Sequence, residues 1–115
     1  MNPTLFGAGG DMISTTSDLN RFITALLGGR LLPRRLLDEM KTPAVPGQAY
    51  GLGLAWRDTT CGIRVYGNLV DAVSYQAWYD STEDGRHQVA IALTPNFKVD
   101  TDDSVDAFLD KAVCS

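Results

Sequence analysis

Two aspartates between residues 66 and 80 are the carboxylates best placed to transfer protons. Side chains two residues apart in a strand share a face, so we expect Trp78 and Asp80 on one face of a sheet. An aspartate beside an indole in a partly buried cleft has a raised pKa, which acid–base catalysis near neutral pH requires. Asp71, which directly follows Asn68-Leu69-Val70, is the second candidate acid or base.

The side chains around these aspartates could orient a small apolar molecule for non-covalent chemistry. The candidate ligand-binding residues are Tyr66, Asn68, Leu69, Val70, Tyr75 and Trp78. Structural roles are the competing interpretation, because aspartates in loops commonly bond their own backbone and aromatic residues on central strands usually form core. For Asp80 the competing interpretation is a solvated carboxylate at a sheet edge.

The other polar residues give weaker signals. His87, the only histidine, follows Asp84-Gly85 in an expected tight turn, so we expect it to be solvated. The aspartates between residues 100 and 103 lack the glycine and the closing glutamate of a calcium loop. We therefore predict neither a metal site nor a cofactor.

The hydrophobic spacing predicts the elements that position these residues. An amphipathic helix, which Ser17 could cap, ends at Gly28-Gly29, and a shorter helix begins at Pro33. Four short β-prone runs follow, at 52–57, 63–66, 74–81 and 88–94, and helical spacing returns from Val105 to Val113. The sequence predicts an α+β fold in a single domain, 1–115. It has two N-terminal helices, an antiparallel β-meander of three to four strands, and a C-terminal helix packed on the sheet.

The composition is that of one globular domain, with 115 residues of which 44% are hydrophobic and 21% charged. The net charge is −4 and the ten basic residues are scattered, which argues against a nucleic-acid partner. No apolar run approaches the roughly 20 residues that cross a bilayer, and the first residues lack the pattern of a secretion signal. We expect no membrane association and, for the sequence as written, a cytoplasmic location.

The two cysteines, Cys61 and Cys114, lie far apart in the sequence, and neither belongs to a Cys-x-x-Cys pair. Two interpretations are open at this point. They could be unpaired thiols, or they could form a disulfide that adds roughly 4 kcal/mol to stability by closing a long loop.

Four separated segments carry a family pattern: "GAGGDMISTTSDLNRFITALLGGRLLP", "AYGLGLAWRD", "VYGNLVDAVSYQ" and "STEDGRHQVAIALT". In this order and spacing they resemble the C-terminal part of the serine β-lactamase and penicillin-binding family, closest to the Streptomyces-type D-alanyl-D-alanine carboxypeptidases. The resemblance covers nearly the whole chain and implies a partial β-lactamase-like fold and a secreted ancestor. It also implies a Cys61–Cys114 disulfide, because some members carry cysteines at similar positions.

The resemblance implies three catalytic elements. A Ser-x-x-Lys pair supplies nucleophile and base, and a Tyr-x-Asn or Ser-x-Asn element shuttles protons. A Lys-Thr-Gly or His-x-Gly segment binds the substrate carboxylate and shapes the oxyanion site. The first two elements belong upstream of the matched segments, and no serine in this sequence has a lysine three residues later.

The third element aligns but is altered. Tyr66 and Gly67 match it, whereas Asn68 replaces the histidine or lysine, Leu69 replaces a small polar residue, and Val70 replaces the glycine. A β-branched residue at this last position would fill the space through which ligand and backbone approach. We expect these positions to form the turn between two strands, and we expect no hydrolysis of β-lactams or peptides by this chain alone.

The resemblance also bears on partners, because the family fold places other strands beside the 88–94 strand. Without them this strand is an exposed apolar edge, which either a second copy in a homo-oligomer or a missing N-terminal half would cover. Three functions stay open: an inactive carboxypeptidase-like fragment or pseudoenzyme, a stand-alone enzyme that cyclises or isomerises a small apolar molecule, and a non-catalytic binding module.

Overall fold

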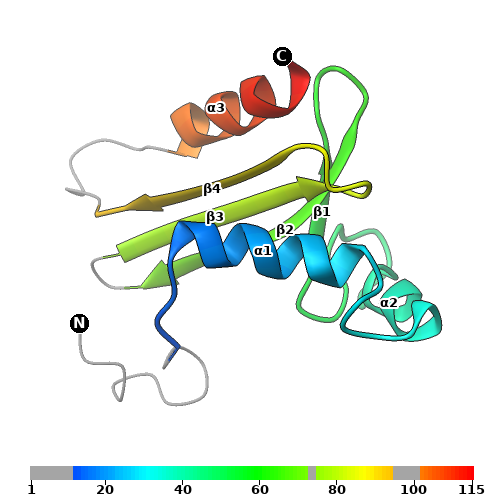
Figure 1. The fold of residues 1–115 in the computed structure, drawn as a ribbon. Helices are drawn as coiled ribbons and strands as arrows, with labels where there is room; N and C mark the ends of the chain where they lie inside the picture. The colour runs from blue at the N-terminus through cyan, green and yellow to red at the C-terminus, as the bar shows by residue number, and fades with distance from the viewer. Residues whose placement is uncertain (1–11, 73–74, 95–101) are drawn as a thin grey trace.

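The computed structural model describes residues 12–72, 75–94 and 102–115. Two helices come first, an antiparallel sheet follows, and a third helix ends the chain (Figure 1). The elements are α1 (Thr16–Leu27), α2 (Arg34–Met40), β1 (Ala55–Asp58), β2 (Arg64–Ala72), β3 (Tyr75–Thr82), β4 (Gln88–Leu93) and α3 (Asp102–Cys114). This arrangement confirms the predicted α+β class.

The four strands form one antiparallel meander in the order β1-β2-β3-β4. Directly opposed residues in such a sheet share a face, so the register assigns the side chains. Asn68 opposes Tyr79 on the face that α1 covers, and Leu69 opposes Trp78 on the other face. α1 packs across β3 and β4, whereas α3 runs along β4 (Figure 1). We call the two faces the α1 face and the α3 face.

The α1 face carries the main hydrophobic core. Its buried residues come from α1, α2 and the segment before β1: Ile23, Leu26, Leu27, Leu37 and Leu54. Tyr66 and Tyr79 of the sheet pack against this cluster. Each fully buried aliphatic side chain contributes roughly 1.5–3 kcal/mol, so this layer accounts for much of the apolar stabilisation.

The start of α1 differs from the prediction. Thr15 is the N-cap, and its hydroxyl accepts a hydrogen bond from the backbone N–H of Asp18 at 3.1 Å. Ser17 lies inside the first turn, so the predicted cap was wrong. A cap must accept from an N–H two or three residues further on, and Asp18 in the first turn adds a favourable charge at the positive helix end. The helix ends at Gly28, as predicted.

β2 is longer than the sequence indicated. Asn68, Leu69 and Val70 lie in the strand and not in a turn, because the ladder with β3 continues to the pair Ala72 and Tyr75. The β-forming Leu-Val pair extends the strand past Gly67, which had suggested a turn. The connection to β3 falls at residues 73–74, outside the described part of the chain.

β1 is shorter than predicted and begins at Ala55. Gly53 has a φ of 76°, a left-handed conformation that does not continue a regular strand. The Asp84-Gly85 hairpin signal is confirmed, since Gly85 turns with a φ of 74° between β3 and β4.

α3 is fastened to the turn between β1 and β2. Cys61 and Cys114 form the expected disulfide, with their Cα atoms 5.9 Å apart. Beside it, Asp110 accepts hydrogen bonds from the backbone N–H of Thr60 at 2.8 Å and from its hydroxyl at 2.6 Å. The apolar residues that α3 buries are Val105, Leu109 and Val113.

No helix in the described ranges is long and apolar enough to cross a membrane.

Candidate functional site

The altered motif lies on a strand segment that is paired on one side only. β1 pairs with β2 as far as Ala55 opposite Gly67, and β3 pairs with β2 along its other edge. From Asn68 to Ala72, the outer edge of β2 therefore has no strand partner among the described residues. Backbone groups along such an edge can pair with an extended ligand.

Asn68 closes the end of the β1 pairing. Its Nδ2 donates to the carbonyl oxygen of Gly53 at 3.0 Å, and its Oδ1 accepts from the backbone N–H of Leu69 at 2.8 Å. The amide thus engages the protein through both of its ends. Leu69 points to the α3 face and is 55% exposed, so an apolar side chain faces solvent beside this edge.

Two tyrosines on the α1 face, Tyr66 and Tyr79, pack against the core. The rings of Trp56 and Tyr66 lie 6.4 Å apart, and the ammonium of Lys41 lies 4.9 Å from the centre of the Tyr66 ring. Burial raises the pKa of Tyr79, and the neighbouring Tyr50 and Asp80 raise it further. Tyr66, predicted to bind a ligand, is half-buried against α1 and α2.

Asp80 lies on the α3 face and forms an ion pair across β2. Its Oδ2 is 3.3 Å from both Nε and Nη2 of Arg57 on β1. Gly67 lies between the two strands at this point, and a Cβ there would come within 2.7 Å of Asp80 Oδ1. The missing side chain of Gly67 gives the Arg57–Asp80 pair room to form.

Burial raises the pKa of Asp80, Arg57 lowers it again, and Asp106 on α3 raises it. Only 14% of the Asp80 side chain is exposed. The predicted upward shift is confirmed in direction, whereas the interpretation of Asp80 as a solvated edge residue was wrong because β3 is a central strand. The carboxylate of Asp80 is thus paired with Arg57 and largely buried.

The sequence did not reveal Arg57 as a partner of Asp80. Arg57 is a third exposed and makes this contact diagonally, which depends on the register of three strands. One signal was available: Gly67 directly follows the β-prone run 63–66, and a glycine in a strand can mark a close approach of another group.

The register separates the candidate ligand-binding residues. Asn68 lies on the α1 face, as does Tyr75, which is 40% exposed. Leu69, Trp78 and Asp80 lie on the α3 face. One pocket cannot collect all of these side chains, because alternate residues of a strand point to opposite faces. Val70 and Asp71 oppose Ala77 and Gln76 in the ladder, and their side chains lie outside the described part.

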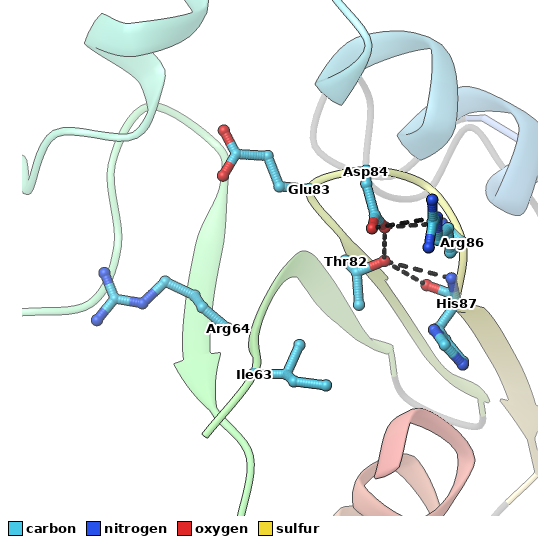
Figure 2. A pocket seen from close by; sticks show the side chains of 7 residues that line it. All are labelled: Ile63, Arg64, Thr82, Glu83, Asp84, Arg86 and His87. Carbon is cyan, nitrogen blue, oxygen red and sulfur yellow. Dashed lines mark hydrogen bonds and ion pairs between the residues drawn. The ribbon is translucent and has the colours of Figure 1, made fainter. Parts of the chain in front are cut away.

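A concave region lies where the β3–β4 turn meets the start of β2 (Figure 2). This groove of about 450 Å³ is lined by Ile63, Arg64, Thr82, Glu83, Asp84, Arg86 and His87. His87 is exposed at the turn, as predicted.

Several polar side chains of this groove bond one another or neighbouring residues. Thr82 donates its hydroxyl to Asp84 at 2.7 Å, and Arg86 lies 3.7 Å from the same carboxylate (Figure 2). Glu83 pairs with Lys41 at 2.9 Å. These contacts stabilise the hairpin between β3 and β4. The described residues also contain no group of three or more potential metal ligands.

Two solved structures have a fold similar to that of this chain. No family model matches the chain. A D-stereospecific amidohydrolase from Streptomyces sp. has a similar structure with a TM-score of 0.78 and 36% identity, over 93% of this chain and 33% of that one. The D-amino acid amidase from Ochrobactrum anthropi SV3, solved with D-phenylalanine, gives a TM-score of 0.67 and 26% identity, over 89% and 37%.

Both proteins belong to the penicillin-binding and β-lactamase superfamily of serine hydrolases. The chain has part of that fold. It spans about a third of the length of either structure that it matches. The superfamily resemblance seen in the sequence is thus confirmed, while the comparisons do not distinguish the carboxypeptidase branch within it.

Proposed function

We propose that β2 of this chain forms one side of a serine hydrolase site that acts on carbonyls of D-amino acid residues. The chain supplies no nucleophile to this site. The observation that carries the proposal is the similarity to the D-stereospecific amidohydrolase, 36% identical over 93% of the chain. Fold alone does not determine function, so the argument depends on the strand that carries the altered motif.

The proposed substrate class rests on a feature that the two similar structures and the sequence resemblance have in common, a D-configured residue. The two similar structures are named for D-configured amides, and the four sequence segments resemble D-alanyl-D-alanine carboxypeptidases. In both reactions a serine attacks a carbonyl attached to a D-residue. The open outer edge of β2 from Asn68 to Ala72 offers backbone groups that could align such a substrate.

The chain by itself lacks the groups that acylation requires. No serine has a lysine three residues later, so no hydroxyl is activated by a neighbouring base. Asn68 already donates to Gly53 and accepts from Leu69, which leaves it poorly placed to bind a carboxylate. The nucleophile would come from polypeptide outside these residues.

A chimera tests this proposal. The third of the Streptomyces amidohydrolase that this chain matches is replaced by this chain, and hydrolysis of D-phenylalanine amide is measured. We expect a folded chimera whose kcat/KM is about 100-fold below the parent, because a disturbed oxyanion site costs roughly that factor. Asn68→His with Val70→Gly should recover at least part of this loss, while L-phenylalanine amide stays unhydrolysed.

The control is Leu31→Ala, a half-exposed position between α1 and α2, which should leave the rate of the chimera unchanged. A folded chimera that gains no D-selective hydrolysis from the two restored residues would contradict the proposal. So would turnover of D-phenylalanine amide by the isolated chain.

A further inference from the structure

The disulfide joins the last residue of α3 to an exposed turn of the sheet. Cys114 ends α3, and Cys61 lies between β1 and β2, where the residue is exposed to solvent. An external thiolate can attack a disulfide sulfur that it can reach, and exposed disulfides are commonly the regulatory ones. The Cys61–Cys114 bond is therefore open to reduction in the folded protein.

α3 has little else to keep it folded in place. The helix has 13 residues, and isolated helices of about this length are marginal in water. The side chains that it buries are Val105, Leu109 and Val113. The α1 layer, in contrast, rests on a cluster of five buried residues to which α2 and the segment before β1 contribute. The docking of α3 thus depends on the disulfide more than the packing of α1 does.

The hydrogen bonds between α3 and the β1–β2 turn lie beside the disulfide. Thr60 directly precedes Cys61, and its backbone N–H and hydroxyl both donate to Asp110. Both bonds are exposed to solvent, where polar contacts between side chains contribute little to stability. The disulfide keeps Thr60 and Asp110 close together, and without it water would compete for the same groups.

α3 covers charged and apolar residues of the sheet. Burial raises the pKa of Asp80, Arg57 lowers it, and Asp106 on α3 raises it, so the helix lies near this carboxylate. Asp106 also brings a second negative charge towards Asp80, which opposes the docking of the helix. Val65, which opposes Arg57 in the ladder and shares its face, is fully buried. Departure of α3 would expose Val65 and the Arg57–Asp80 pair.

We propose that the Cys61–Cys114 disulfide is a redox latch, which holds α3 over the sheet and, when a dithiol reduces it, releases the helix from the α3 face. One thiolate of the dithiol attacks a sulfur of the bond and forms a mixed disulfide, which the second thiolate then displaces. The protein gains two electrons and two protons and carries two thiols, while the dithiol closes to a disulfide. The latch does not depend on the proposed function, because both of its parts belong to this chain.

Hydrogen exchange and the titration of Asp80 test the latch in the whole chain, with dithiothreitol as the dithiol. In the reduced protein, we expect the amides of α3 to exchange at least about 100-fold faster, and those of α1 to change by no more than about threefold. The pKa of Asp80, followed by NMR of its carboxyl carbon, should fall on reduction, because both the burial and Asp106 are removed. The pKa of Asp84, in the turn between β3 and β4, should not change.

The double variant Cys61→Ser, Cys114→Ser controls for the reductant. It should resemble the reduced protein with or without dithiothreitol, and reoxidation of the native protein should restore slow exchange in α3. An α3 that keeps its protection after reduction would overturn the inference. Faster exchange in α3 with an unchanged pKa of Asp80 would also overturn it, because the helix would then fray without leaving the sheet. So would equal acceleration in α1 and α3, because the bond would then hold the whole fold.

Discussion

The two faces of the sheet are held by different kinds of interaction. On the α1 face, Ile23 and Leu37 are fully buried in a continuous apolar cluster. On the α3 face, the helix is held by a disulfide, by two hydrogen bonds from Thr60 to Asp110, and by a small buried set of apolar residues. The α1 face should therefore respond to changes in side-chain volume, and the α3 face to redox state and pH.

The largest expected effect is loss of the disulfide. Replacing both Cys61 and Cys114 by serine should lower the free energy of unfolding by about 4 kcal/mol, because the open chain regains the entropy of a long loop. Denaturant unfolding gives this value. Hydrogen exchange should accelerate first in α3, whereas α1 keeps its protection.

Reduction of the native protein should reproduce the effect, and the same reductant should not change the double serine variant. Equal acceleration of exchange in α1 and α3 would show that the two faces unfold as one unit, and would contradict the difference between them.

The α1 face should be most sensitive to a cavity. Leu37→Ala should cost about 3 kcal/mol of unfolding free energy, because a fully buried leucine is removed from a packed cluster. Leu31→Ala, at a position that is 51% exposed, should cost no more than about 0.5 kcal/mol. Similar losses in the two variants, measured from urea midpoints, would mean that the core is not packed as described.

A side chain at Gly67 should disturb the contact between β2 and β3. A Cβ there would meet the carbonyl oxygen of Tyr79 and would lie 2.7 Å from Asp80 Oδ1. Gly67→Ala should cost about 2 kcal/mol, since one strand must shift to relieve the overlap. Thermal unfolding monitored by circular dichroism measures the loss, and an unchanged transition would contradict the close approach.

The smallest effects concern pH, and two carboxylates on the α3 face should act with opposite sign. Burial raises the pKa of Asp80 above its ordinary value of 3.8, so its contribution to stability is present at lower pH and lost as the pH rises through the raised value. The two hydrogen bonds from Thr60 lower the pKa of Asp110, so its contribution is lost as the pH falls through the lowered value.

In Asp80→Asn, the free energy of unfolding should fall less steeply as the pH rises above 3.8. In Asp110→Asn, it should fall less steeply as the pH falls into the acidic range. Urea unfolding of the two variants and the parent across this range compares the slopes. Two variants with the same slope change would contradict the assigned surroundings of one carboxylate.

The sequence predicted the elements better than the contacts between them. The apolar spacing of α1 and the Asp84-Gly85 turn are local signals, and both held. The turn expected at Asn68-Leu69-Val70 failed, because pairing with β3 draws this segment into β2. The Arg57–Asp80 pair was missed, since it joins β1 to β3 across Gly67 and depends on the register of three strands.

The candidate site was predicted only in its parts. Asp80 was a candidate because its pKa was expected to be raised, and burial does raise this pKa. The carboxylate is nevertheless paired with Arg57 and only 14% exposed. Alternation along the strands divided the expected ligand-binding residues between the two faces. The sequence did not show that these residues lie on two faces of the sheet. A turn was expected at Asn68-Leu69-Val70, and alternation along a strand cannot be followed through a turn.

We propose that these residues form part of a serine hydrolase site and do not include its acylating serine. Intact-protein mass spectrometry of the chain after incubation with a labelled penicillin tests this proposal. We predict an unchanged mass, because no serine here has the lysine that would activate it. A stoichiometric covalent adduct on any serine would contradict the proposal.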